Sequence, residues 1–208
     1  MHVNTPLKVH YYGTPVVLVS TRDVEGRANL SPMSSAWWLG GSAMLGIGNK
    51  SQTAKNLREQ GECVLNLAPS DLAESVDRLA DLTAVDPVPP TKAAKGYRHE
   101  ADKFGAAGLT EQAAELVAPP RVLECPVQLE CRVVDSHPFN ATCTAFEVEV
   151  LRSHVDERML VPGTAYVDPD AWDPLIMKFC EYYGEGRHLR PSRLAANWRM
   201  PHQHLAAQ

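Results

Sequence analysis

A short stretch of this 208-residue chain gathers groups that could hold an anion. Residues 48–53 read GNKSQT, which places Lys50, Ser51 and Thr53 between an apolar segment and a run of good helix formers. Free backbone N–H groups, the helix dipole, an ammonium and two hydroxyls would converge there. The stretch therefore predicts a phosphate site, although Ser51 could instead serve only as a helix cap beside an unrelated surface lysine.

A second stretch, residues 29–41, reads NLSPMSSAWWLGG. Small hydroxyls suit a turn and paired indoles suit a core, so their combination raises the question of what such a surface would hold. If the backbone is extended here, Trp37 and Trp38 must point to opposite sides. We expect one indole to face a ligand or a partner subunit and the other to pack.

Other chemistries have weaker support. The GxSxG, GxGxxG and P-loop patterns of hydrolases and nucleotide-binding proteins do not occur. Cys125 and Cys131 would share one face of an alternating strand near His137, but without CxxC or HxxxH spacing core cysteines are favoured over a zinc site. His202 and His204 could bind metal, and a solvated tail explains them equally well. We expect no metal site.

Composition narrows the class of protein. A hydrophobic fraction of 44% is that of an ordinary globular chain, and the net charge of −5 provides no basic surface for nucleic acid or anionic lipid. The apolar runs are too short to span a bilayer, and the first residues lack an export signal. Five irregularly spaced cysteines do not form a disulfide framework. We expect a cytoplasmic protein without nucleic-acid or membrane partners.

The first half of the chain must position these residues. We expect strands over residues 15–22, 28–35, 43–49 and 62–68, with a turn at Gly26. Pro32 indicates an edge, a bulge or an early strand end. A helix should begin after Ser51 and end before Gly61, and an amphipathic helix should cover residues 70–82.

In the second half, residues 83–95 form a long proline-rich loop without regular structure, of a kind that is often functional. Short helical pieces should follow over residues 96–117. Two long alternating strands, 124–137 and 141–157, should pair antiparallel, and a last helix should cover 173–184. About six strands in hairpin order favour an antiparallel barrel over a Rossmann sheet.

The order of these segments resembles the flavin reductase-like family, whose members fold as FMN-binding split barrels. The likeness rests on NLSPMSSAWW, NKSQT, GECVLNLA, DKFGAAGLT, VAPPRVLECPVQLEC and EVLRSHVDE, which follow one another in order between Thr14 and Glu157. It implies a mainly β fold with some α (α+β), an antiparallel split barrel with peripheral helices. One domain would span residues 1–208, with 162–208 as a C-terminal extension that could cover the pocket and select a substrate.

The resemblance also implies which residues bind FMN. We expect the binding to be non-covalent, because no His or Cys occupies an evident flavin-attachment motif. Residues 49–53 match the segment that binds the phosphate, and residues 31–37 match the segment along the isoalloxazine ring. A flat heteroaromatic ligand needs an apolar wall and a few donors, which the second segment supplies. Residues 103–104 match a motif near the pocket. The expected cofactor-binding residues are Ser31, Pro32, Met33, Ser34, Ser35, Trp37, Asn49, Lys50, Ser51, Thr53, Lys103 and Phe104.

The implied activity is that of a flavin reductase, in which NADH or NADPH passes hydride to flavin N5 and no side chain need be a nucleophile. A homodimer is implied, and reduced flavin could serve a partner monooxygenase. The chain departs from the family pattern at two positions that concern the binding of a nicotinamide. Val148 stands where many members have a glycine. His137 is the only candidate for the histidine that many members place near the nicotinamide. An FMN-dependent enzyme with its own organic substrate, or a non-catalytic flavin- or haem-binding module, remain as alternatives.

Overall fold

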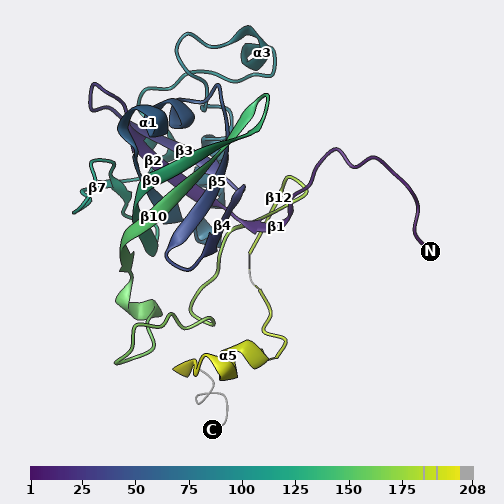
Figure 1. Ribbon diagram of the computed structural model, residues 1–208, viewed down its shortest axis with the longest axis vertical. Coiled ribbons are helices and arrows are strands. Elements are labelled where there is room, and N and C mark those ends of the chain that lie inside the picture. The colour runs from purple at the N-terminus through teal and green to yellow at the C-terminus, as the bar shows by residue number, and fades with distance from the viewer. Residues whose placement is uncertain (185, 191, 202–208) are drawn as a thin grey trace.

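The computed structural model describes residues 1–184, 186–190 and 192–201 (Figure 1). Its main element is a seven-stranded antiparallel sheet with the strand order β3-β2-β6-β9-β10-β5-β4. The strands are β2 (Val17–Arg22), β3 (Ala28–Met33), β4 (Ala36–Leu39), β5 (Ser42–Gly48), β6 (Glu62–Leu67), β9 (Val127–Asn140) and β10 (Cys143–Val155). The predicted strands of the barrel are confirmed, including the long antiparallel pair β9–β10 that crosses the body in Figure 1.

The sheet is buried on both faces. Val17 and Val19 of β2 belong to one core cluster, and Leu18 between them belongs to a second cluster on the opposite side. This is the result expected of a short, uniformly apolar strand. Pro32 lies in β3, which is an edge of the sheet, so its missing N–H removes no ladder hydrogen bond. The edge interpretation of Pro32 is confirmed.

Helix α1 (Gln52–Gln60) begins and ends as predicted. Ser51 caps its N-terminus, because the Ser51 side chain accepts a hydrogen bond from the backbone N–H of Ala54. Gly61 ends it in the left-handed region, with φ 69°. The expected helix over 70–82 is shorter, since a 3-10 turn η1 (Ser70–Leu72) leads into α2 (Ala73–Arg78).

Three predictions for the second half are wrong. The proline-rich loop contains one helical turn, α3 (Pro90–Ala93), which Pro90 can begin because a helix needs no N–H at its first position. The helical expectation for 96–117 holds only for α4 (Lys103–Ala107). Residues after Gly108 instead form β7 (Glu111–Gln112), which pairs with β8 (Arg121–Val122).

The helix expected over 173–184 is a β-ribbon. Strands β11 (Ile176–Lys178) and β12 (Glu181–Tyr183) pair with each other, and β11 pairs with β1 (Tyr12–Pro15). The preceding Leu175 is buried in the core. The 3-10 turn η2 (Glu157–Met159) follows β10, and α5 (Arg193–Asn197) lies apart from the barrel in Figure 1.

The two cysteines that were considered for a zinc site lie in the protein interior. Cys125 and Cys131 are both buried, in different core clusters, so the core interpretation is confirmed and the shared face is not.

The fully buried carboxylate of Glu130 accepts hydrogen bonds from the backbone N–H groups of Glu115 and Leu116 and contacts the His154 ring at 2.6 Å. Among the described residues, no helix has the length and apolar composition to cross a membrane.

Candidate functional site

A cavity of about 970 Å³ lies where the ends of β3 and β5 meet the start of α1 and the loop before α4. It brings together the two stretches that the sequence singled out, although about fifteen residues separate them in the chain. The predicted residues that line it are Ser31, Pro32, Met33, Ser34, Ser35, Asn49, Lys50, Ser51 and Thr53.

At the start of α1, the two hydroxyl residues have different surroundings. Ser51 Oγ accepts from Ala54 N at 3.1 Å and donates to Gly48 O at 2.9 Å, so the capping interpretation holds for this side chain. Thr53 is only 3% exposed, and its Oγ1 accepts a hydrogen bond from Asn29 Nδ2. The N–H groups of Gln52 and Thr53 belong to the first turn, where no preceding turn supplies carbonyl partners.

Asn49 is held in place beside this helix start. Its side-chain oxygen accepts hydrogen bonds from Arg58 Nη2 at 2.9 Å and from Thr144 Oγ1 at 2.6 Å. Its backbone N–H donates to Thr142 O. The oxygen of the carboxamide is therefore directed toward α1 and β10, which leaves the NH₂ group as the part of the side chain able to donate elsewhere.

The loop between α2 and α4 adds cations that sequence reasoning missed. A β-bridge between Ser51 and Ala84 attaches this loop to the start of α1. Lys92 Nζ donates to Thr83 O at 3.0 Å and lies 5.2 Å from the centre of the Tyr97 ring. Burial lowers the pKa of Lys92. The only available signal was the length of the loop, which marked it as functional without naming residues.

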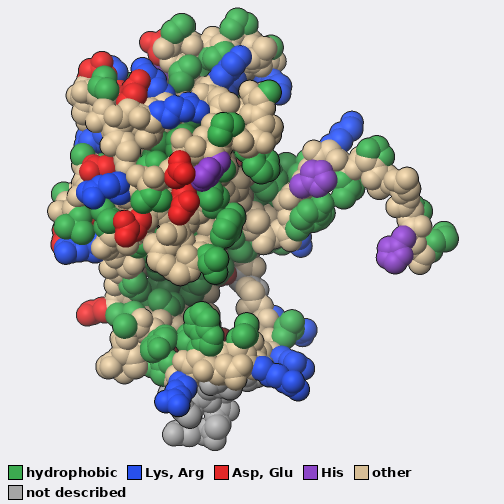
Figure 2. Space-filling model, in the orientation of Figure 1, with side chains coloured by type: hydrophobic (Ala, Val, Ile, Leu, Met, Phe, Trp, Pro, Cys, Tyr) green, Lys and Arg blue, Asp and Glu red, His purple; other side chains and the backbone are tan. Residues whose placement is uncertain are grey.

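Every charged side chain that lines the cavity, among the described residues, is a lysine: Lys50, Lys92 and Lys95. The whole chain carries a net charge of −5, and on the face in Figure 2 acidic and basic side chains lie among one another over the barrel. The charged side chains of the cavity lining thus contribute positive charge only, in contrast to the mixed charges on that face of the barrel. An anionic ligand is the one that such a lining favours.

The remaining lining is largely apolar and closely packed. Val16, Val19, Met33, Ile47 and Met177 line it together with the serines of residues 31–35. Backbone approach is tight here, since Gly46 N donates to Ser35 O at 2.8 Å. A Cβ built on Gly46 would lie 3.2 Å from Ser35 Cβ, which explains why a glycine occupies this position.

Three predicted residues do not line this cavity. Trp37 is 56% exposed on β4, whereas Trp38 packs against the core, so the two indoles do point opposite ways. Phe104 is buried in the first core cluster. Lys103 is also buried and lines a smaller neighbouring cavity of about 200 Å³.

The two positions that depart from the family pattern lie away from the cavity lining. Val148 is fully buried in the core. His137 is half exposed on β9, where its ring lies 3.7 Å from Asp135 and 3.9 Å from Glu147. The structure therefore does not bring His137 to the predicted site.

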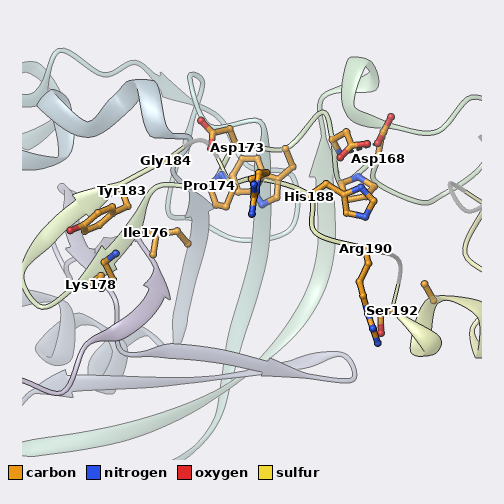
Figure 3. A pocket seen from close by; sticks show the side chains of 16 residues that line it. Asp168, Asp173, Pro174, Ile176, Lys178, Tyr183, Gly184, His188, Arg190 and Ser192 are labelled. Carbon is orange, nitrogen blue, oxygen red and sulfur yellow. Dashed lines mark hydrogen bonds between the residues drawn. The ribbon is translucent and has the colours of Figure 1, made fainter. Parts of the chain in front are cut away.

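A second cavity of about 800 Å³ lies beside the ribbon β11–β12 (Figure 3). Ile176, Lys178 and Tyr183 face it, whereas Met177 and Tyr182 of the same ribbon face the first cavity. No predicted site residue lines this second space. Within the described chain, no group of three or more His, Cys, Asp or Glu side chains could hold a metal ion, and His202 and His204 lie outside the described residues.

A family model described as the flavin reductase like domain matches residues 9–182. The chain belongs to the flavin reductase-like family. YdfE, an uncharacterized protein of Bacillus subtilis (strain 168), is 35% identical to this family member over 184 residues, which are 88% of each chain. The family implies an oxidoreductase with a flavin as cofactor or substrate.

Solved structures share the fold of this family member. Flavoredoxin from Methanosarcina acetivorans superposes with a TM-score of 0.75 at 21% identity, over 96% of this chain and 100% of that chain. The 2-nitrobenzoate 2-nitroreductase NbaA of Pseudomonas fluorescens gives 0.71 at 19% identity, over 89% and 86%. The predicted fold class, an antiparallel split barrel with peripheral helices, is confirmed.

Proposed function

We propose that this member of the flavin reductase-like family binds FMN non-covalently in the 970 Å³ cavity and reduces it with NADH or NADPH. The observation that carries the proposal is that the donors of residues 31–35 and 49–53 meet in one cavity whose charged lining is entirely lysine. A phosphate monoester carries nearly two negative charges at neutral pH, which matches this lining.

The phosphate would be held at the start of α1. Lys50 supplies an ammonium, Thr53 a hydroxyl, and the first turn of the helix its unpaired N–H groups. Lys92 and Lys95 add positive charge from the loop that the Ser51–Ala84 bridge attaches to the same place. These groups fit a phosphate because none of the described lining residues is acidic.

The ring would lie along residues 31–35, with Met33 and other apolar side chains covering it and Ser34 or Ser35 beside its polar edge. Bound FMN supplies a two-electron acceptor at N5 for the hydride of a nicotinamide. The chain contributes by orienting the rings against each other and excluding water from the apolar part of the cavity. We assign no nucleophile and no catalytic acid or base.

The test compares FMN with riboflavin, which has the same ring and no phosphate. FMN should bind more tightly, and Lys50→Ala should weaken FMN by about tenfold while leaving riboflavin nearly unchanged. Lys55→Ala is the matched control, because Lys55 lies on α1 but does not line the cavity. Equal affinities for the two ligands in the unmodified protein would exclude the phosphate site.

Reduction is measured separately, by anaerobic stopped-flow bleaching of the bound flavin with NADH and with NADPH. We expect one or both to bleach it. If dithionite bleaches the flavin and neither nicotinamide does, the reductase proposal fails.

An FMN-dependent enzyme with its own organic substrate is the second candidate. The ribbon β11–β12 favours it, because Met177, Cys180 and Tyr182 line the flavin cavity and could contact a substrate. NbaA, which shares the fold, is named as a 2-nitrobenzoate 2-nitroreductase. Reoxidation of the reduced flavin by a nitroaromatic acid, faster than by buffer alone, would support this candidate. A flavin that neither a nicotinamide nor a substrate turns over would leave the non-catalytic module.

We also propose a homodimer. Trp37 and Leu39 are 56% and 76% exposed on β4, an edge strand of the barrel sheet, where a second copy could cover them. Sedimentation of the unmodified protein should give twice the mass of one chain, and Leu39→Glu should shift the equilibrium toward one chain. A monomer at micromolar concentration would refute this proposal. Delivery of reduced flavin to a monooxygenase stays a prediction.

A further inference from the structure

We propose that Lys103 is a positioning residue for the anion end of the cavity, which is the part lined by Lys50, Ser51 and Thr53 at the start of α1. Lys103 acts through Asn29 on the hydroxyl of Thr53. The inference rests on the proposed phosphate site and assigns a task to a buried lysine that does not itself line that cavity. It explains how a residue outside the cavity can influence the ligand inside it.

Lys103 contacts Asn29 inside the protein. Lys103 is 3% exposed, and its Nζ donates to Asn29 Oδ1. An ammonium has only donors, so Asn29 must present its oxygen to Lys103 whichever way the amide atoms are assigned. The lysine therefore fixes the orientation of the Asn29 carboxamide.

The orientation of the Asn29 carboxamide determines where its NH₂ group points. With its oxygen turned to Lys103, Asn29 directs Nδ2 toward Thr21 Oγ1 at 3.0 Å and Thr53 Oγ1 at 3.1 Å. Asn56 Nδ2 donates to the same Thr21 oxygen, at 3.0 Å. The buried amides thus act as donors and the threonine oxygens as acceptors.

The Thr53 hydroxyl has one proton that it can donate. Because its oxygen already accepts from Asn29, Thr53 is left with a hydrogen to donate, and the described residues provide no acceptor for it. Thr53 lines the cavity beside Lys50 and Ser51. The network therefore makes Thr53 a donor toward the anion end.

A purely structural role accounts poorly for Lys103. Lysine is almost never fully buried unless an opposite charge accompanies it, because desolvation of the ammonium is costly. Here the hydrogen-bond partner is a neutral amide. Burial and repulsion from Lys92 lower the pKa of Lys103, and attraction to Glu100 offsets only part of that lowering. No carboxylate within the described chain lies within 4 Å of Nζ as an ion pair. An apolar side chain would fill the same space at lower cost, so the ammonium itself has a use.

The sharpest variant is Asn29→Asp. A carboxylate has the same shape and only acceptors, so the Thr53 proton would turn inward to it and be lost to the ligand. The Lys103 ammonium would pair with the new carboxylate, which keeps the variant folded. We expect the FMN-to-riboflavin affinity ratio to fall by about tenfold or more, as for loss of one hydrogen bond to a charged group.

Lys103→Met should lower the same ratio by a smaller factor of about three, because the amide can then adopt both orientations. Lys55→Met is the matched control: Lys55 lines the same small cavity as Lys103 but does not contact Asn29. It removes one charge there and should change the ratio by less than about twofold. Both losses should shrink in a Thr53→Val background, because the group they act on is then missing.

The outcomes separate the two proposals. If Lys50→Ala and Thr53→Val leave the ratio at its unmodified value, the phosphate site is wrong. Suppose that those two variants lower the FMN-to-riboflavin affinity ratio. The role of Lys103 alone is then overturned if Lys103→Met and Asn29→Asp leave the ratio unchanged. It is also overturned if their effects are as large in the Thr53→Val background as in the unmodified protein. Thermal melts show which variants fold, and if Lys103→Met does not, Asn29→Asp alone decides.

Discussion

Ser51 and Thr53 stand two residues apart at the start of α1, and replacing each one separately should show that their hydroxyls have different tasks. Ser51→Ala removes a helix cap, because Ser51 Oγ accepts from Ala54 N and donates to Gly48 O. Loss of an N-cap costs about 1 kcal/mol of unfolding free energy. For a chain of 208 residues this corresponds to a fall of about 2–4 °C in Tm.

The same variant should leave the FMN-to-riboflavin affinity ratio unchanged, since the Ser51 proton is already donated within the protein. Thr53→Val should do the reverse. It removes a donor that faces the anion end, and a hydrogen bond to a charged group contributes about 1.5–3 kcal/mol, which corresponds to a loss of about tenfold to a hundredfold in FMN affinity.

The assay is calorimetric titration of both ligands into each variant, with scanning calorimetry for Tm. The reasoning is refuted if Ser51→Ala lowers the ratio as much as Thr53→Val does. That result would mean that Ser51 exchanges its bond with Gly48 for one with the phosphate when the ligand binds.

Three further results are expected. Burial alone would raise the pKa of the Glu130 carboxyl, but its hydrogen-bond donors hold this pKa below 4.5. The carboxylate therefore stabilises the fold above pH 4.5, and this stabilisation is lost as the pH falls below that value. Glu130→Gln should lower the unfolding free energy by about 3 kcal/mol at pH 7, measured by urea titration, and should weaken the loss of stability on acidification. Burial, followed by repulsion from Lys92, lowers the pKa of Lys103 from 10.5 to about 8. The unfolding free energy should therefore rise with pH between 8 and 10.5, and it should rise less in Lys103→Met. Parallel plots of unfolding free energy against pH for the two proteins would contradict this. Gly46→Val should weaken FMN and riboflavin equally, by about tenfold, because its side chain crowds the ring region and not the phosphate; a selective loss of FMN would be inconsistent.

Local signals in the sequence predicted part of the structure because the determining interactions are local. The Ser51 cap, the αL conformation at Gly61 and the turn at Gly26, with φ 81°, each depend on residues within one turn of the chain. The apolar strands were equally plain. Nine of the twelve predicted site residues line one cavity. They come from two short stretches, and the order of the segments along the chain resembled that of a known family, which implied that these stretches meet.

The ribbon at 176–183 could not be predicted in this way. Its two-residue turn places Phe179 and Cys180 at φ 50° and 69°, conformations that glycine and asparagine normally occupy. Without those residues the turn has no signature, and the surrounding apolar pattern is also compatible with a helix. Pairing with β1, more than 160 residues away, decides the outcome.

The contributions of Lys92 and Lys103 also depend on distant contacts. Lys92 reaches the cavity because Ala84 bridges to Ser51, and Lys103 acts through Asn29, 74 positions earlier in the chain. In the sequence, Lys92 looks like a solvated loop residue, whereas Lys103 was expected near the pocket only because it matches a family motif. Only the fold reveals that Lys92 lines the 970 Å³ cavity and that Lys103 is buried beside a smaller neighbouring one.

The ribbon β11–β12 separates two cavities, and because its side chains alternate between its two faces, each cavity is lined by a different set of residues. Met177 and Tyr182 line the 970 Å³ cavity, and Ile176, Lys178 and Tyr183 line the 800 Å³ cavity. A substitution on one face of the ribbon can therefore change one cavity without changing the residues that line the other. If the first cavity binds FMN as proposed, substitutions that face the second cavity can change what that cavity accepts while the flavin site keeps its residues.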